Sequence, residues 1–136
     1  METCLNCFKE AMKLKEVEAR EYSPLALAYL GDAVYELAIR TFVMNHGNTQ
    51  VNKMHKKTAG LVKAEAQANF YKVLEEELTE EEKAVYRRGR NAKSVTMAKH
   101  ATMKDYRMAT GFEALMGVFV PDGADGADGG AFGTRA

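Results

Sequence analysis

The arrangement of apolar and polar residues predicts helices along almost the whole chain. Leu5, Phe8 and Met12 recur at helical spacing, which predicts a first helix over residues 3–20. No segment of useful length alternates between apolar and polar residues as a half-buried strand does. We therefore predict an all-α fold, built as a helical bundle.

The most apolar segment predicts a long helix over residues 25–44. Ser23 and Pro24 form a helix start, with serine as the N-cap and proline at the first helical position. The helix is expected to stop at the glycine-containing stretch 45–48. Apolar residues occur on every side of this helix, so we expect it to be central in the core.

The rest of the chain divides into further helices, a polar loop and a tail. Thr79 and Glu82 have the spacing of a capping box, which marks a helix start. Residues 1–120 are expected to form one domain, and residues 121–136 a Gly- and Asp-rich tail that cannot bury a core. The predicted segments are helices over 51–75, 79–89 and 104–120 and a basic loop over 90–103.

Two carboxylates interrupt the apolar helices. Each acid borders an edge of small residues where another helix can approach closely. The edge beside Asp32 consists of Ala28, Gly31 and Ala38, and the edge beside Glu113 consists of Thr110, Ala114 and Gly117. We expect Asp32 inside the molecule or at the bottom of a cleft, in contact with Glu113. Two like charges share a dry site only with a cation or a shared proton.

Periodicity alone leaves two explanations of these acids open. Oxygen ligands with room for water suit magnesium, which takes one or two carboxylates from a protein. A structural ion pair of the acid with Arg40 or Arg107 is the other explanation.

The charges are balanced in number and segregated in position. The 136 residues include 19 basic and 19 acidic residues, so the net charge says nothing about nucleic acid. Residues 75–82 hold six glutamates, whereas residues 83–107 hold eight Lys or Arg and one acid, Asp105. A second basic cluster lies around Lys53, Lys56 and Lys57. The net charge of the whole sequence therefore conceals two basic surfaces.

The composition also indicates in which cellular compartment the protein is expected. No run approaches the roughly 20 apolar residues that a membrane span needs, and the N-terminal region lacks the apolar core of a signal peptide. We expect a cytoplasmic protein. Cys4 and Cys7 form only half of a zinc-ribbon pattern and are interpreted as ordinary thiols.

Several stretches resemble the ribonuclease III catalytic domain, and its short bacterial form, Mini-ribonuclease III, in particular. That form keeps the nuclease domain and lacks a double-stranded-RNA-binding domain. The stretches are LALAYLGDAVYELAIR, NKMHKKTAGLVKAEAQA, LTEEEKAVYRRGRNAKS and DYRMATGFEAL, and the likeness covers roughly residues 20–120. The resemblance implies an all-helical homodimer that cleaves double-stranded RNA with Mg2+, or Mn2+ as an alternative ion.

The resemblance also implies roles for particular residues. Asp32 and Glu113 occupy the essential acidic positions, as catalytic residues and metal ligands. The two further acidic positions of the larger family are replaced here by Ala28 and Thr110, which reduces the ligand set. Glu36 is a candidate outer-shell ligand, or alternatively a surface partner of Arg40 one turn later.

The basic surfaces are expected to bind the phosphates of double-stranded RNA, with no DNA or membrane as a partner. The implied substrate is the paired ends of the 23S ribosomal RNA precursor. Two rival interpretations are a non-catalytic RNA-binding module of the same fold and a helical interaction protein with structural carboxylates. The candidate RNA-binding residues are Lys53, Lys56, Lys57, Arg87, Arg88, Arg90, Asn91 and Lys93.

Overall fold

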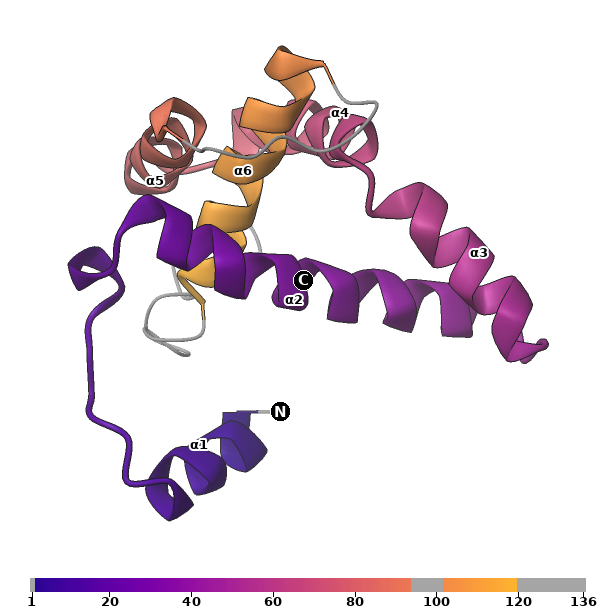
Figure 1. Cartoon of the computed structure of the whole chain (residues 1–136), viewed down its shortest axis with the longest axis horizontal. Helices are drawn as coiled ribbons and strands as arrows, with labels where there is room; N and C mark the ends of the chain where they lie inside the picture. Colours follow the sequence, from indigo (N-terminus) through magenta and orange to yellow (C-terminus); the bar gives the residue numbers. More distant parts are fainter. Residues whose placement is uncertain (1, 94–101, 120–136) are drawn as a thin grey trace.

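The computed structural model describes residues 2–93 and 102–119, and all regular elements within these ranges are helical (Figure 1). The predicted all-α fold is therefore confirmed. None of the described helices combines the length and apolar content that a membrane span requires. The α-helices are α1 (Glu2–Ala11), α2 (Pro24–Asn45), α3 (Val51–Leu61), α4 (Ala64–Leu74), α5 (Glu80–Asn91) and α6 (Met103–Gly117), and the 3-10 helices are η1 (Ala19–Glu21) and η2 (Glu75–Glu77).

Local hydrogen bonds start the helices where the sequence predicts them. The Ser23 hydroxyl accepts from the Ala26 amide at 3.1 Å at the start of α2. At the start of α5, the Thr79 hydroxyl accepts from the Glu82 amide at 3.1 Å, and the Glu82 carboxylate accepts from the Thr79 amide at 2.8 Å. These caps satisfy amide groups that have no partner inside the helix.

The central feature of the fold is the crossing of α2 and α6 (Figure 1). A Cβ atom added to Gly31 of α2 would fall on the backbone carbonyl of Glu113. A Cβ atom added to Gly117 of α6 would fall on the carbonyl of Leu27. The two helices therefore pack backbone against backbone, as the small-residue edges predict, although Ala38 of the predicted edge is exposed.

The core lies where α2, α4, α5 and α6 meet. Phe112 and Leu115 of α6 are its largest fully buried side chains. Phe112 makes edge contacts with Tyr35 of α2, with ring centroids 5.5 Å apart. The rings of Tyr71 of α4 and Tyr86 of α5 are stacked, with their centroids 3.6 Å apart. Aromatic contacts thus fix the helices around α6, which is buried along most of its length.

Two predicted helices are shorter than expected. The helix predicted over residues 3–20 ends at Ala11, because Lys13 adopts a left-handed φ of 54° and the Leu14 amide bonds back to the Lys9 carbonyl at 3.0 Å. The helix predicted over 51–75 breaks after Leu61 into α3 and α4. Residues 94–101 of the predicted basic loop and the predicted tail over 121–136 lie outside the described residues.

The α2–α6 crossing predicts opposite effects of two glycine substitutions on stability. Gly31→Ala should lower the free energy of unfolding by about 3 kcal/mol or more, because the new methyl group meets backbone rather than a movable side chain. At Gly60 in α3 an added Cβ would meet open space, so Gly60→Ala should raise the free energy of unfolding by about 0.5–1 kcal/mol. Urea denaturation of both variants checks this, and equal stability of the two would contradict the close crossing.

Candidate active site

The two predicted acids meet at the α2–α6 crossing. Gly31 packs on the backbone of Glu113, which brings the next residue of α2, Asp32, beside the Glu113 side chain. The two carboxyl groups are within hydrogen-bonding contact of each other. The predicted contact between the acids is therefore confirmed, and it follows directly from the approach of the two helices.

The Glu113 carboxyl group is held in its protonated form by its surroundings. Burial first, and then the hydrogen bond and negative charge of Asp32, raise the pKa of Glu113 to about 8, whereas a hydrogen bond from Gln67 opposes them. Without a cation, Glu113 thus keeps its proton at neutral pH. Such perturbed pKa values are typical of sites built to bind charge or transfer protons.

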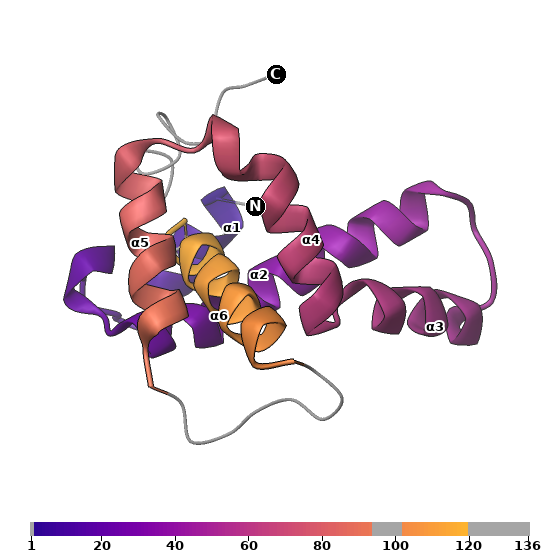
Figure 2. The ribbon, with the colours of Figure 1, turned by 90° about the horizontal axis from the view of Figure 1, so that it is seen from above.

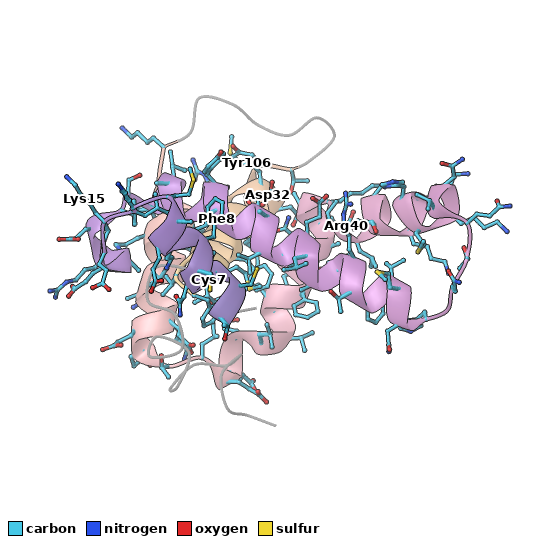
Figure 3. The ribbon with its side chains drawn as sticks, turned by 90° about the horizontal axis from the view of Figure 1, so that it is seen from below. Cys7, Phe8, Lys15, Asp32, Arg40 and Tyr106 are labelled. Carbon is cyan, nitrogen blue, oxygen red and sulfur yellow. The ribbon has the colours of Figure 1, made fainter. Side chains whose placement is uncertain are left out.

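The predicted burial of Asp32 is wrong. Asp32 is exposed at the surface of α2 (Figure 3). Glu113, by contrast, is half-buried. The reason is that α6 covers α2 on the side of Gly31 and Ala28 and leaves the following face open. Leu25, which shares the face of Asp32 on a helical wheel, is itself 38% exposed. The pair therefore has one sheltered acid and one that faces solvent.

The structural ion pair considered for these acids is not formed. Within residues 2–93 and 102–119, neither Asp32 nor Glu113 pairs with a basic side chain. Arg40 instead contacts Glu36 at 3.7 Å, the surface pair expected for acids and bases one turn apart. Figure 3 shows Arg40 farther along α2 than Asp32. The role of Glu36 as an outer-shell ligand stays a prediction.

A third residue of the site, Gln67 of α4, was missed by the sequence reasoning. Its side chain is buried, and its Nε2 donates to the Val62 carbonyl at 3.1 Å and to Glu113 Oε2 at 3.5 Å. The available signal was a polar residue one turn before the buried Tyr71 of the same helix. That signal alone does not distinguish a site residue from a surface glutamine.

The oxygen atoms of this site fit a magnesium ion. Mg2+ is bound in proteins through one or two carboxylates and keeps several of its waters. Asp32 and Glu113 supply two adjacent carboxyl groups, and Gln67 Oε1 is a buried acceptor without a partner in the described structure. No third Asp, Glu, His or Cys completes a cluster among the described residues. Any further ligands would come from water or from a bound phosphate.

The predicted basic residues form two exposed groups on opposite sides of α6 (Figure 2). The α3 group comprises Lys53, Lys56 and Lys57, and the α5 group comprises Arg87, Arg88, Arg90, Asn91 and Lys93. The prediction of a basic loop from residue 90 is wrong for Arg90 and Asn91, because α5 continues to Asn91. Gly89 does not break the helix but packs against Ala114 of α6.

The remaining candidate ligands of the sequence are ordinary side chains. Cys4 and Cys7 are free and exposed on α1, as the interpretation of ordinary thiols predicts. The helix α1 lies apart from the crossing of α2 and α6 (Figure 1). The cysteines therefore have no part in the acidic site.

Comparison with known proteins identifies the fold and the chemistry. Residues 25–123 match the Ribonuclease III domain. The chain is 52% identical over 101 residues to the Mini-ribonuclease 3 of Clostridium tetani, an alignment that covers 74% of this chain and 67% of that protein. It is 49% identical over 100 residues to the Mini-ribonuclease 3 of Enterococcus faecalis, an alignment that covers 72% of this chain and 76% of that protein.

A solved structure agrees with these relatives. The crystal structure of protein FN1578 from Fusobacterium nucleatum superposes with a TM-score of 0.66 at 36% sequence identity, covering 74% of this chain and 80% of that one. The matched Ribonuclease III domain includes both acids and the α2–α6 crossing. The chain therefore belongs to the ribonuclease III family, within its Mini-ribonuclease 3 group, and is a ribonuclease III-type endoribonuclease.

Proposed function

We propose that this endoribonuclease cleaves double-stranded RNA in a magnesium-dependent reaction at the Asp32–Glu113 pair. The observation that carries the proposal is the contact between these two acids within a ribonuclease III domain, with no basic partner among residues 2–93 and 102–119. A pair of acids with this arrangement is unfavourable unless a cation or proton neutralises it. Binding of a cation would thus relieve the electrostatic repulsion between the two adjacent carboxylates.

Asp32 and Glu113 would hold the magnesium ion, with manganese as an alternative. When bound, the ion would supply a water molecule of lowered pKa as the nucleophile and would neutralise charge on the phosphate. The exposed Asp32 leaves the site open to a large substrate, while the half-buried Glu113 remains fixed by α6.

The two basic groups would bind the RNA backbone. Their helices, α3 and α5, lie on opposite sides of α6 (Figure 2), and an elongated duplex across the acidic pair would contact both groups. Contacts to phosphate and groove shape suit double-stranded RNA better than single strands, because α3 carries no Phe, Tyr or Trp and the one Tyr of α5, Tyr86, is buried. We propose the paired ends of precursor 23S ribosomal RNA, in the cytoplasm, as the substrate, and expect no binding to DNA.

A homodimer would place one acidic pair against each strand of the duplex. The face of α2 away from the core carries the exposed residues Tyr29, Ala33, Leu37 and Met44, which share one side of the helix. Tyr29 is 85% exposed and Met44 67%, an unusual exposure for side chains of this size. A twofold contact along this α2 stripe, defined by these four residues, would cover them.

Removing the charge of Asp32 tests the proposed chemistry. Asp32→Asn keeps the shape of the side chain and removes a metal ligand, so cleavage of long double-stranded RNA in Mg2+ should fall by at least about 100-fold. RNA binding in a gel-shift assay should persist, because the basic groups are unchanged. Glu81→Gln, at an exposed acid of α5, is the matched control. If Asp32→Asn cleaves RNA at the wild-type rate, the assignment of the active site is wrong. If Glu81→Gln also loses cleavage, the loss in Asp32→Asn is not specific to the acidic pair.

The raised pKa of Glu113 predicts a pH dependence of stability. The folded-state pKa of about 8 lies above the ordinary value of 4.5, so the folded protein holds a proton that the unfolded chain releases. The associated stability is fully present below about pH 4.5 and is lost as the pH rises through about 8. Melting temperatures in EDTA should therefore fall across this window, and Glu113→Gln should remove this part of the fall. Identical pH profiles for the two proteins would contradict the raised pKa of Glu113.

The α2 stripe predicts the oligomeric state. Sedimentation equilibrium should report about twice the chain mass of 15.1 kDa for the wild type. Leu37→Lys places a charge within the stripe and should shift the mass to that of one chain. Val73→Lys, at an 80% exposed valine of α4, is the matched control and should remain dimeric. A wild type that is monomeric at micromolar concentration and still cuts both strands together would overturn the dimer.

A further inference from the structure

Gln67 makes two hydrogen bonds from one buried amide group. The residue is only 3% exposed. Its Nε2 donates to the Val62 carbonyl at the junction of α3 and α4 at 3.1 Å, and to Glu113 Oε2 at 3.5 Å. The same amide therefore connects this junction with the sheltered acid of the active site.

The orientation of the Gln67 amide follows from its partners. A carbonyl oxygen and a carboxylate oxygen are both acceptors, so the NH2 group has to face them. The opposite orientation would set Gln67 Oε1 against two acceptors. The orientation present leaves Oε1 buried and without a partner in the described structure. Because buried acceptors are normally paired, an unpaired one indicates that the two donated bonds dictate the position of this side chain.

The carboxylate of Glu113 requires such a donor to have a defined orientation. The last torsion of a glutamate side chain is broad, so the rotamer alone does not fix the plane of its two oxygens. A donor on Oε2 restricts that torsion and leaves Oε1 available for a cation. Asp32 is acidic and exposed, and it offers no comparable donor when ionised.

The junction held by Gln67 is itself fixed from a second side. The Tyr35 hydroxyl of α2 donates to the Leu61 carbonyl at 2.7 Å, one residue before the partner of Gln67. Both bonds occupy carbonyls where α3 ends and α4 begins. Tyr35 and Gln67 thus anchor the same junction, but only Gln67 also donates to Glu113. This difference separates a local structural role from a role in the site.

We propose that Gln67 is a positioning residue, which orients the Glu113 carboxylate for metal binding by donating to its Oε2 from a side chain anchored at the α3–α4 junction. This inference rests on the proposed function, because it takes Asp32 and Glu113 to be the metal ligands. Partners that hydrogen-bond to metal ligands typically change metal affinity or activity by about 10- to 100-fold when they are lost.

The test compares Gln67→Met with Tyr35→Phe in the full-length protein. Methionine matches the length and volume of glutamine and removes both donated bonds, whereas Tyr35→Phe removes the other bond to the junction and leaves the Gln67–Glu113 contact intact. Binding of Mn2+ alone is measured by isothermal titration calorimetry, without RNA. Cleavage kinetics across a magnesium series and thermal melting accompany it.

Gln67→Met should bind Mn2+ about 10- to 100-fold more weakly and require correspondingly more magnesium for half-maximal cleavage, with an unchanged KM for RNA. High magnesium should recover most of kcat. Tyr35→Phe should retain wild-type metal affinity even if its melting temperature falls. Equal metal affinities of Gln67→Met and wild type would overturn the proposal, and so would an equal loss in Tyr35→Phe.

Glu113→Gln separates this proposal from the proposed function. If Glu113→Gln binds Mn2+ as the wild type does, the acids are not the metal site and both proposals fail. If Glu113→Gln loses metal binding while Gln67→Met keeps it, only the role of Gln67 is rejected. If Gln67→Met does not fold, Gln67→Leu takes its place, and its affinity for Mn2+ is compared with that of the wild type in the same way.

Discussion

The backbone contact between α2 and α6 is the constraint on which the site depends. Gly31 and Gly117 allow the two helices to approach closely enough for Asp32 and Glu113 to touch. Two adjacent acids cost free energy in a folded protein, and the packing of Phe112, Ala114 and Leu115 on the same helix offsets this cost. The packing of the core thus keeps the two acids adjacent, because they cannot move apart without separating the helices.

The location of this crossing could be predicted from the sequence because its determinants are local. An acid beside a small-residue edge is visible on each helix, and the capping residues Ser23 and Thr79 mark helix starts irrespective of tertiary contacts. The exposure of Asp32 could not be predicted in the same way. A helical wheel shows which residues share a face, but whether another helix covers that face depends on the arrangement of the whole bundle.

The break between α3 and α4 was missed for a related reason. Neither proline nor an interrupting glycine stands at Val62 and Lys63, and the residues that follow favour a helix. Continuation of the helix would engage the carbonyls of Leu61 and Val62 with later amides. The Tyr35 hydroxyl of α2 and the Gln67 amide of α4 occupy these carbonyls instead. The bond from Tyr35 spans 26 residues of sequence, so a tertiary contact overrides local propensity here, and no single-helix pattern reports it.

The same break lies between the helix with the predicted RNA-binding lysines and the acidic pair. Helix α3, which carries Lys53, Lys56 and Lys57, packs on α2 and meets α4 at the junction near Val62 (Figure 2). The Tyr35 hydroxyl and the Gln67 amide both bond to carbonyls of this junction. Because Gln67 also donates to Glu113, one buried amide lies between the helix with the basic residues and the acidic pair.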